Sequence, residues 1–222
     1  MPAFSMPVLS SLVEEINSTH DLFSNSWLNN QETKVNLKTK RINHIIDSEK
    51  VIALDFLNII NSYHSELLSL YTTTDFEFDY VDYEIRTRIK QKDSIINKLI
   101  QYRIDNSEGK ISINKCLNDM FGVRIIFDDL DHECPEFNAC LKLLEEEYCL
   151  KVVKRNLEGY SATHLYFKNE SNFKFPWELQ IWSKQDERYN IDSHKEHKSK
   201  RKYTTWPEVY SKRIELERSE TI

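Results

Sequence analysis

The sequence predicts an α+β fold: a mixed sheet of about five strands, flanked by helices and preceded by a helical N-terminal extension. Three patterns support this fold. Apolar residues recur at helical spacing in the first seventy positions, short runs alternate with period two from Thr74 onward, and helical stretches separate the later strand-like runs. A length of 222 residues suits one domain, which we divide into an extension (1–73), a core (74–204) and a C-terminal helix (205–222).

The N-terminal extension is predicted to contain two helices. The second has a broad apolar stripe between Val51 and Leu68, and Ser48 is placed to cap its N-terminus. The polar segment 29–45 that precedes it is either an exposed helix or a loop. The first helix has one apolar stripe, formed by Val8, Leu9, Leu12, Val13 and Ile16.

The core is predicted to alternate strands and helices. Residues 76–81 and 84–90 alternate apolar and polar side chains, which indicates two strands joined in a hairpin near Asp82. A helix then begins near Asp93 or Ser94. The remaining elements are a buried strand at 122–127, a helix at 133–148, strands at 150–156, 162–169 and 176–182, and helices at 183–202 and 206–219.

The composition limits how the chain can bind phosphates. It has only three glycines, Gly109, Gly122 and Gly159, whose spacing cannot form a Walker loop or a G-x-G-x-x-G turn. Lys and Arg side chains and a metal must therefore hold any nucleotide phosphates. We expect Gly122 and Gly159 to occupy positions where a Cβ would be excluded by backbone conformation or close packing. The net charge of −6 argues against general nucleic-acid binding, although residues 86–98 and 194–202 are locally basic.

The four cysteines form no C-x-x-C pair, so we predict reduced, structural thiols. No run of about 18 apolar residues is present, which argues against a membrane span. The N-terminus lacks a basic region followed by an apolar core, which argues against a secretory signal. We therefore expect a cytoplasmic protein with no membrane partner.

Two segments have the residue types that bind phosphates and a divalent cation. Between Arg88 and Lys98 a cationic strand leads into a helix N-terminus, where free N–H groups favour anions. The alternative is an edge strand with solvated lysines. Asp119 comes directly before a buried strand and suits Mg²⁺, which prefers carboxylates and substrate phosphates. Asp119 could instead cap a turn and pair with Arg124.

Two further segments suit recognition of a nucleoside. Tyr160 follows a glycine at the start of a strand and can stack on a base, while His164 projects to the same side. A sheet tyrosine with a core histidine would look the same. In the last strand Glu178, Gln180 and Trp182 share one face, and burying these polar groups costs free energy unless a cation or substrate meets them. An ion pair with Arg124 would also compensate.

Hydrolytic chemistry has no obvious residues in this chain, since no Ser/His/Asp triad, cysteine nucleophile or H-E-x-x-H motif is visible.

Taken in order, the four segments resemble the RelA/SpoT synthetase family. The family pattern consists of R-x-K-x-x-x-S-I-x-x-K, D-x-x-G-V-R-I, N-G-Y-R-S-x-H and E-I-Q-I-R-T blocks. This chain has RIKQKDSIINK, DMFGVRI, EGYSATH and ELQIW, with order and spacing preserved over roughly residues 84–200. The resemblance implies a nucleotidyltransferase-like fold and a single-domain synthetase that transfers the β,γ-pyrophosphate of ATP to a ribose 3′-hydroxyl with the help of Mg²⁺.

The resemblance also implies roles for single residues. Asp119 and Glu178 would hold Mg²⁺, and Glu178 would be the base that acts on the acceptor hydroxyl. Tyr160 would stack on the acceptor base, and His164 and Gln180 would position the acceptor and the metal. The ATP phosphates would be bound by Arg88, Lys90, Ser94 and Lys98.

Two departures from the family pattern bear on the acceptor. The family arginines after the tyrosine and in the last block are Ser161 and Trp182 here, which weakens the case for a free nucleotide such as GDP or GTP. The wording of the last two blocks also resembles toxic small alarmone synthetases, which modify the 3′-CCA end of tRNA and are encoded beside an antitoxin protein. The lysines of 29–45 are one candidate tRNA-binding patch. The other comprises Lys195, Lys198, Lys200, Arg201 and Lys202, which a solvated helix face would explain equally well.

Three hypotheses remain: transfer to tRNA, which we favour, synthesis of (p)ppGpp from GDP or GTP, and a non-catalytic module that binds nucleotide or RNA.

Overall fold

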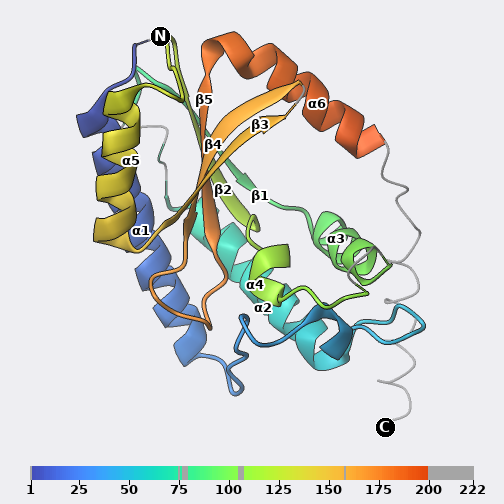
Figure 1. Cartoon of the computed structure of the whole chain (residues 1–222). Coiled ribbons are helices and arrows are strands. Elements are labelled where there is room, and N and C mark those ends of the chain that lie inside the picture. Colours follow the sequence, from blue (N-terminus) through green and yellow to red (C-terminus); the bar gives the residue numbers. More distant parts are fainter. Residues whose placement is uncertain (1, 75, 77–79, 105–107, 158, 200–222) are drawn as a thin grey trace, which may run out of the picture.

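The computed structural model describes residues 2–74, 76, 80–104, 108–157 and 159–199 (Figure 1). Its centre is a five-stranded sheet in the order β1-β2-β5-β4-β3. β2 and β5 run parallel, and the other neighbouring pairs are antiparallel, so the sheet is mixed as predicted. The strands are β1 (Glu84–Ile89), β2 (Phe121–Phe127), β3 (Lys151–Leu157), β4 (Tyr160–Phe167) and β5 (Trp177–Ser183).

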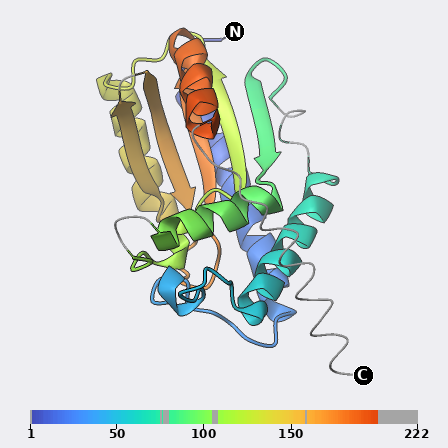
Figure 2. The same ribbon diagram turned by 90° about the vertical axis from the view of Figure 1, so that its right-hand side faces the viewer.

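The helices divide between the two faces of the sheet. In Figure 1, α1 and α5 cover one face, and α6 crosses the opposite face. Figure 2 shows α6 over one half of the strands and α3 across the other half. The helices are α1 (Met6–Asn29), α2 (Leu54–Tyr71), α3 (Lys92–Ile104), α4 (Ile113–Cys116), α5 (Pro135–Tyr148) and α6 (Glu187–Ser199), with 3₁₀ turns at Ile42–His44 and Lys184–Asp186.

The central strand β5 separates the core from the site. Trp177 is fully buried and its ring contacts His20 and Phe23 of α1. Trp182 instead packs on the other face, with Ile126, Ala162 and Ile191 of α6. Successive side chains of a strand point to opposite faces. The predicted division of β5, with Glu178, Gln180 and Trp182 on one face, is therefore confirmed.

The N-terminal helices belong to the same apolar core as the sheet. Leu9, Leu12, Val13 and Ile16 are fully buried, so the predicted stripe of the first helix is confirmed. The residues of this stripe cluster with core positions of the strands, including Leu179 and Ile181. Burial of apolar surface is the dominant stabilising term in folding. The buried side chains of α1 therefore hold this helix against the face of the sheet that lies opposite the site.

The second helix begins later than its apolar pattern suggested. Ala53, not Ser48, is the N-cap of α2, and Val51 and Ile52 lie before the helix. Ile52 forms an isolated β-bridge with Ile46, so part of the apolar stripe anchors a connecting segment. Most of segment 29–45 is loop, with the 3₁₀ turn near its end, as one of the two alternatives predicted.

The predicted hairpin near Asp82 is wrong. Strand β1 forms as predicted, but its antiparallel partner is β2, with Arg88 opposite Gly122. Tyr80, Val81 and Asp82 lie in turns, and 77–79 lie outside the described residues. The local alternation was real for β1, but the choice of partner depends on contacts distant in sequence.

The other elements largely follow the prediction. Helices α3 and α5 and strands β2 to β5 lie within a few residues of their predicted bounds, whereas the short helix α4 was missed. The segment predicted as one helix at 183–202 starts with the end of β5 and a 3₁₀ turn before α6. The predicted helix at 206–219 lies outside the described residues.

Gly122 and Gly159, the two glycines at which we predicted that a Cβ would be excluded, differ in this respect. Gly159 has φ of +76°, in the turn between β3 and β4, so its prediction is confirmed. A Cβ at Gly122 would meet its nearest atom, Nε of Arg88, at an ordinary 3.6 Å, so the predicted exclusion of a Cβ is wrong there.

All four cysteines are free thiols, as predicted. Within the described part of the chain, no helix combines the length and apolar character needed to cross a membrane.

Candidate active site

A cavity of about 610 Å³ lies on the face of the sheet that α6 crosses, with walls from α3, α6 and the strands. All nine residues that the sequence predicted for ATP, metal and acceptor line this one cavity, although they come from four elements, the loop after β1 and the loop before β2. They are Arg88, Lys90, Ser94, Lys98, Asp119, Tyr160, His164, Glu178 and Gln180.

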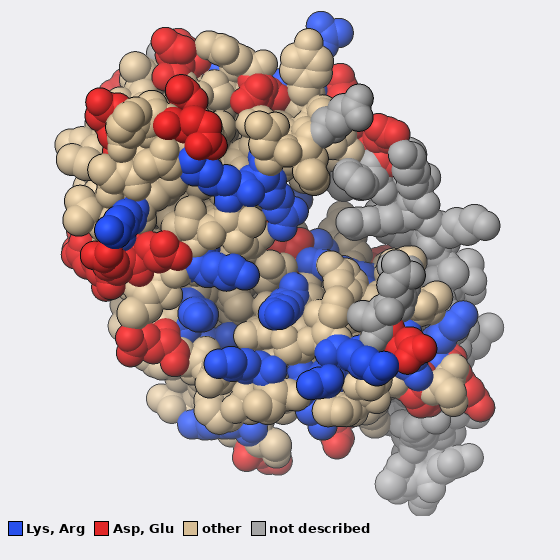
Figure 3. All heavy atoms as spheres, viewed as in Figure 1, with Lys and Arg blue, Asp and Glu red and all other residues tan. Residues whose placement is uncertain are grey.

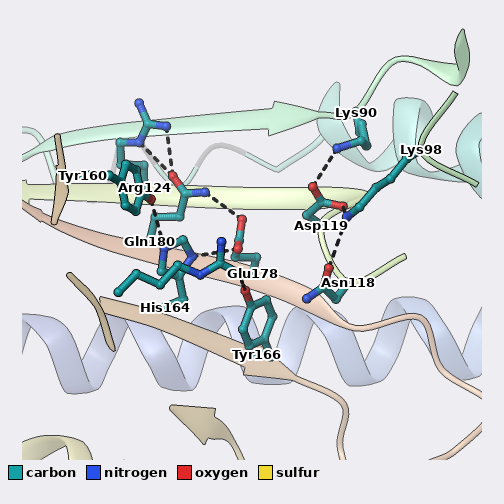
Figure 4. Close-up of polar contacts among 11 residues, drawn as sticks. Lys90, Lys98, Asn118, Asp119, Arg124, Tyr160, His164, Tyr166, Glu178 and Gln180 are labelled. Carbon is teal, nitrogen blue, oxygen red and sulfur yellow. Dashed lines mark hydrogen bonds and ion pairs between the residues drawn. The ribbon is translucent and has the colours of Figure 1, made fainter. Parts of the chain in front are cut away.

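One end of the cavity is cationic. Lys90, directly after β1, and Lys98 on α3 both bind Asp119, with Nζ–Oδ distances of 2.7 and 2.9 Å (Figure 4). Lys98 also donates to Asn118 Oδ1 at 3.4 Å. The helical turn between Ser94 and Lys98 directs both side chains to the same wall. Asp119 therefore fixes two ammonium groups side by side.

The charges at this end stabilise one another. Burial raises the pKa of Asp119, but Lys98 and Lys90 lower it more, so the net pKa lies well below the ordinary range. Burial lowers the pKa of Lys90, an effect that Asp119 partly offsets and Lys98 reinforces. The carboxylate is thus ionised at neutral pH and holds the buried lysines in place.

The other end is a connected polar network on β4 and β5 (Figure 4). His164 Nδ1 lies 2.8 Å from Glu178 Oε1, and Tyr160 Oη lies 2.9 Å from His164 Nε2. Gln180 Nε2 donates to Glu178 Oε2 at 2.8 Å. Because an ionised carboxylate only accepts, Nδ1 of His164 carries a proton and donates to Glu178. Both oxygens of Glu178 are therefore oriented by neighbours.

Glu178 is ionised despite its burial. Glu178 is only 4% exposed, and this burial raises the pKa of its carboxyl group. The hydrogen bond from His164, its electrostatic effect and the hydrogen bond from Gln180 together outweigh the effect of burial, and the net pKa of Glu178 is below the ordinary value. Asp119 raises the pKa of Glu178 through its charge, which indicates that the two carboxylates influence each other across the cavity.

The partners of Arg124 in the structure are not the acidic residues that the sequence suggested. Arg124 pairs with neither Asp119 nor Glu178. It donates to Gln180 Oε1 from Nε at 3.2 Å and from Nη2 at 2.9 Å. Its guanidinium lies 3.4 Å from the centre of the Trp182 ring, a cation–π contact. Trp182 thus supports the Arg124 plane, which joins the polar network through Gln180.

Four functional candidates were missed by the sequence reasoning. Lys115, Arg155, Tyr166 and His194 also line the cavity. Arg155 Nη2 donates to Tyr166 Oη at 3.1 Å, beside the Glu178 end. Period-two spacing places Tyr166 on the same face as Tyr160 and His164, so that signal was available. Lys115, Arg155 and His194 are single polar residues in a short helix, an edge strand and a charged helix, where no pattern distinguishes them.

The basic side chains gather around the opening of the cavity. Figure 3 shows Lys and Arg around a recess, whereas many acidic side chains lie toward the edge of this view. Five cations line the cavity, namely Arg88, Lys90, Lys98, Lys115 and Arg155, against the two carboxylates Asp119 and Glu178. A protein with net charge −6 thus presents a cationic hollow suited to a polyanion.

A second cavity of about 440 Å³ adjoins the first, with which it shares Arg88, Gln180 and His194. Its walls combine flat cations with apolar surface: Arg86, Arg124, Trp182 and Ile191. Such walls suit a flat aromatic ring.

The donor set at the first cavity fits Mg²⁺ only if substrate completes it. The described residues contain no cluster of three or more His, Cys, Asp or Glu side chains that could hold a metal. Mg²⁺ is commonly bound by one or two carboxylates together with substrate phosphates. Asp119 and Glu178, both ionised and facing one cavity, provide that partial set.

Of the predicted tRNA-binding patch, only the side chain of Lys195 is described. It is exposed and lies 3.5 Å from Asp192 Oδ1. Lys198 lies on α6, and Lys200, Arg201 and Lys202 lie outside the described residues.

Comparisons with known proteins give structural similarities only. No family model and no curated protein matches the chain. It is similar to the small alarmone synthetase 1 from Bacillus subtilis, at 19% identity over 75% of this chain and 94% of that one, with a TM-score of 0.39. A GTP pyrophosphokinase family protein from Streptococcus pneumoniae matches at 17% identity, 73% and 83% coverage and a TM-score of 0.39. The smu.1046c protein from Streptococcus mutans matches at 20% identity, 73% and 86% coverage and a TM-score of 0.39. With TM-scores below 0.5, these similarities carry no argument about function.

Proposed function

We propose that this chain is a pyrophosphokinase that transfers the β,γ-pyrophosphate of ATP to a ribose 3′-hydroxyl, with the 3′-CCA end of tRNA as acceptor. The observation that supports this function is the meeting of nine separately predicted side chains in one cavity, cationic at one end and aromatic and acidic at the other. The two ends match the two substrates of such a transfer.

The cationic end suits the triphosphate of ATP. Arg88, Lys90 and Lys98 provide positive charge without a glycine loop, and Ser94 in the first turn of α3 adds a hydroxyl. Charge-assisted hydrogen bonds from such groups to phosphate are stronger than neutral ones. The adenosine part extends past Arg88 into the second cavity, where the Arg124 guanidinium and the apolar walls accept a flat base.

The other end suits the acceptor nucleoside. Tyr160 offers its ring to the terminal base, and Glu178 receives the ribose 3′-hydroxyl. His164 and Gln180 hold the two oxygens of Glu178 in fixed directions. Because the carboxylate is ionised, it can accept the proton of the hydroxyl.

The reaction then needs positioning more than covalent help. The 3′-oxygen gives its proton to Glu178 and attacks the β-phosphorus of ATP. The bond between that phosphorus and the oxygen bridging to the α-phosphate breaks, and AMP leaves. Lysine and arginine side chains neutralise the charge that develops on the phosphate oxygens.

Mg²⁺ would be held by Asp119 and Glu178 together with the substrate phosphates. When bound, it supplies Lewis-acid stabilisation of phosphate charge, which is worth several kcal/mol in such reactions. Asp119 then has two functions, because it also orders Lys90 and Lys98.

Transfer to tRNA is favoured by the loss of cations near the acceptor. Ser161 has no charge, and Trp182 acts as the support of Arg124. A tRNA end brings its own backbone, for which exposed Lys195 and the basic residues that follow it are the proposed contacts. Modification of the 3′ end would stop translation, so we propose a toxin that acts in the cytoplasm and is controlled by an antitoxin protein.

Arg155 favours a second candidate, the synthesis of (p)ppGpp from GDP or GTP. Its guanidinium lines the cavity beside Tyr166 and so provides a cation at the acceptor end. Such a cation could bind the 5′-diphosphate of a free nucleotide.

The test offers tRNA and GDP in competition to the purified chain with Mg²⁺ and ATP labelled at the γ-phosphate. We expect label on tRNA and none on tRNA whose terminal ribose has been oxidised with periodate. Label only on the guanine nucleotide would establish the second candidate. If neither acceptor is labelled while ATP still binds, the chain is a non-catalytic nucleotide-binding module.

A further inference from the structure

Helix α6 is fixed to the site face of the sheet through Asn190. The side chain of Asn190 is fully buried and bonds the main chain of β4 twice. Its Oδ1 accepts from Ser161 N at 2.8 Å, and its Nδ2 donates to Ser161 O at 2.7 Å. Ile191, the next residue of α6, packs against the small apolar cluster that contains Trp182. Two hydrogen bonds and an apolar contact therefore set the position of α6 on the sheet.

His194 lies one turn after Asn190, on the same side of the helix. Its ring stacks on Trp182 with centroids 5.9 Å apart and planes at 17°. It meets Tyr160 edge-on, with centroids 5.4 Å apart. It is one of three residues common to the walls of both cavities. The His194 ring therefore lies at the passage between the proposed acceptor and donor ends.

The polar atoms of His194 point to a ligand. Among the described residues, no group hydrogen-bonds its Nε2, although that atom is buried. An unpaired buried polar group costs free energy, so a native protein that contains one calls for a physical explanation. A hydrogen bond to a bound ligand is such an explanation. The cost disappears if a bound molecule provides that partner.

The surroundings decide what kind of partner fits. Burial lowers the pKa of His194 to about 4, and the charges of Arg124 and Arg88 add to the effect. The imidazole is thus neutral at physiological pH and can donate one hydrogen bond and accept another. The edge of a purine offers neutral donors and acceptors of this kind. The guanidinium plane of Arg124, which the buried Trp182 ring supports, suits the face of such a ring.

We infer that His194 is a base-binding residue, which hydrogen-bonds the edge of the ATP purine in the second cavity. This inference rests on the proposed function, since it takes ATP as the donor. It adds a contact to the nucleoside, whereas the residues of the first cavity bind the phosphates. Base binding is then separable from phosphate binding by one side chain.

The test compares two probes on three proteins by isothermal titration calorimetry with Mg²⁺. The probes are a non-hydrolysable ATP analogue and inorganic tripolyphosphate, which has no base. The proteins are the wild-type chain, His194→Phe, which keeps a flat ring on Trp182, and His194→Gln, which keeps a polar group near the position of Nε2. We expect His194→Phe to bind the ATP analogue about tenfold more weakly and His194→Gln to recover most of the loss.

Tripolyphosphate should bind all three proteins within about twofold, since its contacts lie in the first cavity. The inference is overturned if His194→Phe binds the ATP analogue as the wild type does. It is equally overturned if that variant loses affinity for both probes alike, because His194 would then act only on structure. Wild-type protein that binds neither probe would refute the proposed function itself, and wild-type protein that binds both leaves that function standing whatever the variants do.

Discussion

The carboxylate of Asp119 binds two lysines, and under the proposed function it would also bind a metal ion. The two lysines are Lys90 and Lys98, and the metal ion is Mg²⁺. These contacts need not exclude one another, since an ionised carboxylate has about four lone-pair directions. Lys90, Lys98 and a bound Mg²⁺ would then together neutralise the charge of the triphosphate.

Replacement of Asp119 by asparagine separates the two functions. Asp119→Asn frees Lys90 and Lys98, so we expect tripolyphosphate to bind at least as tightly as to wild type when Mg²⁺ is chelated. Transfer from ATP should nevertheless fall by about a hundredfold or more, since a metal contributes several kcal/mol to such reactions. Calorimetry and the labelled-ATP assay measure the two quantities. Asp93→Asn is the matched control, because Asp93 is exposed and lies outside the lining of the cavity. Full transfer activity in Asp119→Asn would rule out a metal-binding role.

The hydroxyl and the ring of Tyr160 have different tasks. The ring is proposed to stack on the acceptor base, while the hydroxyl forms a hydrogen bond with His164, which in turn orients Glu178. Tyr160→Phe keeps the ring, so KM for the acceptor should change by less than about twofold. The kcat should fall by about tenfold, the effect of one lost hydrogen bond at an orienting residue. A raised KM with unchanged kcat would instead show that the hydroxyl serves binding only.

Among the structural elements, the loop between β4 and β5 is held to α1 by a buried histidine. His20 Nε2 donates to Phe175 O at 2.9 Å, and Asn169 Nδ2 donates to His20 Nδ1 at 3.1 Å. This pattern fits the neutral ring only. Burial lowers the pKa of His20 to about 4, the hydrogen bond to Phe175 opposes the shift, and Lys174 adds to it. Lys174 itself pairs with Asp21 on α1, so the same loop is anchored twice.

His20 makes the stability of the fold depend on pH. Below pH about 6.5 the unfolded chain binds a proton at this ring, which the folded chain excludes until its lower pKa is reached. The free energy of unfolding should therefore fall by about 2 kcal/mol from this residue between pH 7 and pH 5. Urea unfolding at the two pH values measures the change, and His20→Gln should show a smaller decrease than wild type by that amount. Equal decreases in the two proteins would contradict the assignment.

The elements themselves differ in how well the sequence predicts them. Short apolar runs marked β2, β4 and β5, because nearly all of their residues are buried, and the apolar stripe marked α1, because it buries one face of the helix in the core. The partner of β1 could not be predicted, since pairing with β2 joins residues more than thirty positions apart. Local alternation carries no information on such a choice, and the turn residues near Asp82 misleadingly suggested a hairpin.

For the molecule as a whole, the candidate site was more predictable than its surroundings. The nine residues that meet in the cavity lie in four short blocks, whose residue types suit a metal, a triphosphate and a base. The roles of Trp182 and Arg155 depend on which strands are neighbours, so they emerge only from the folded chain. The same holds for His194, because α6 is positioned by the Asn190 contact with β4.

The net charge of the molecule and the charge of its cavity have opposite signs. A net charge of −6 disfavours the binding of polyanions in general, whereas the cations that line the cavity favour an anionic ligand there. Under the proposed function, specificity for a nucleotide substrate would come from the walls of the cavity and not from overall charge.

The most direct measurement of the central claim is the identity of the nucleotide released from ATP. Transfer of the β,γ-pyrophosphate releases AMP, whereas transfer of the γ-phosphate alone releases ADP. With purified chain, Mg²⁺, ATP and tRNA, chromatography should show AMP formed in equal amount to modified acceptor. Glu178→Gln should lower this AMP formation by about a hundredfold or more while the ATP analogue still binds. Release of ADP as the sole product, or undiminished AMP formation by Glu178→Gln, would contradict the account.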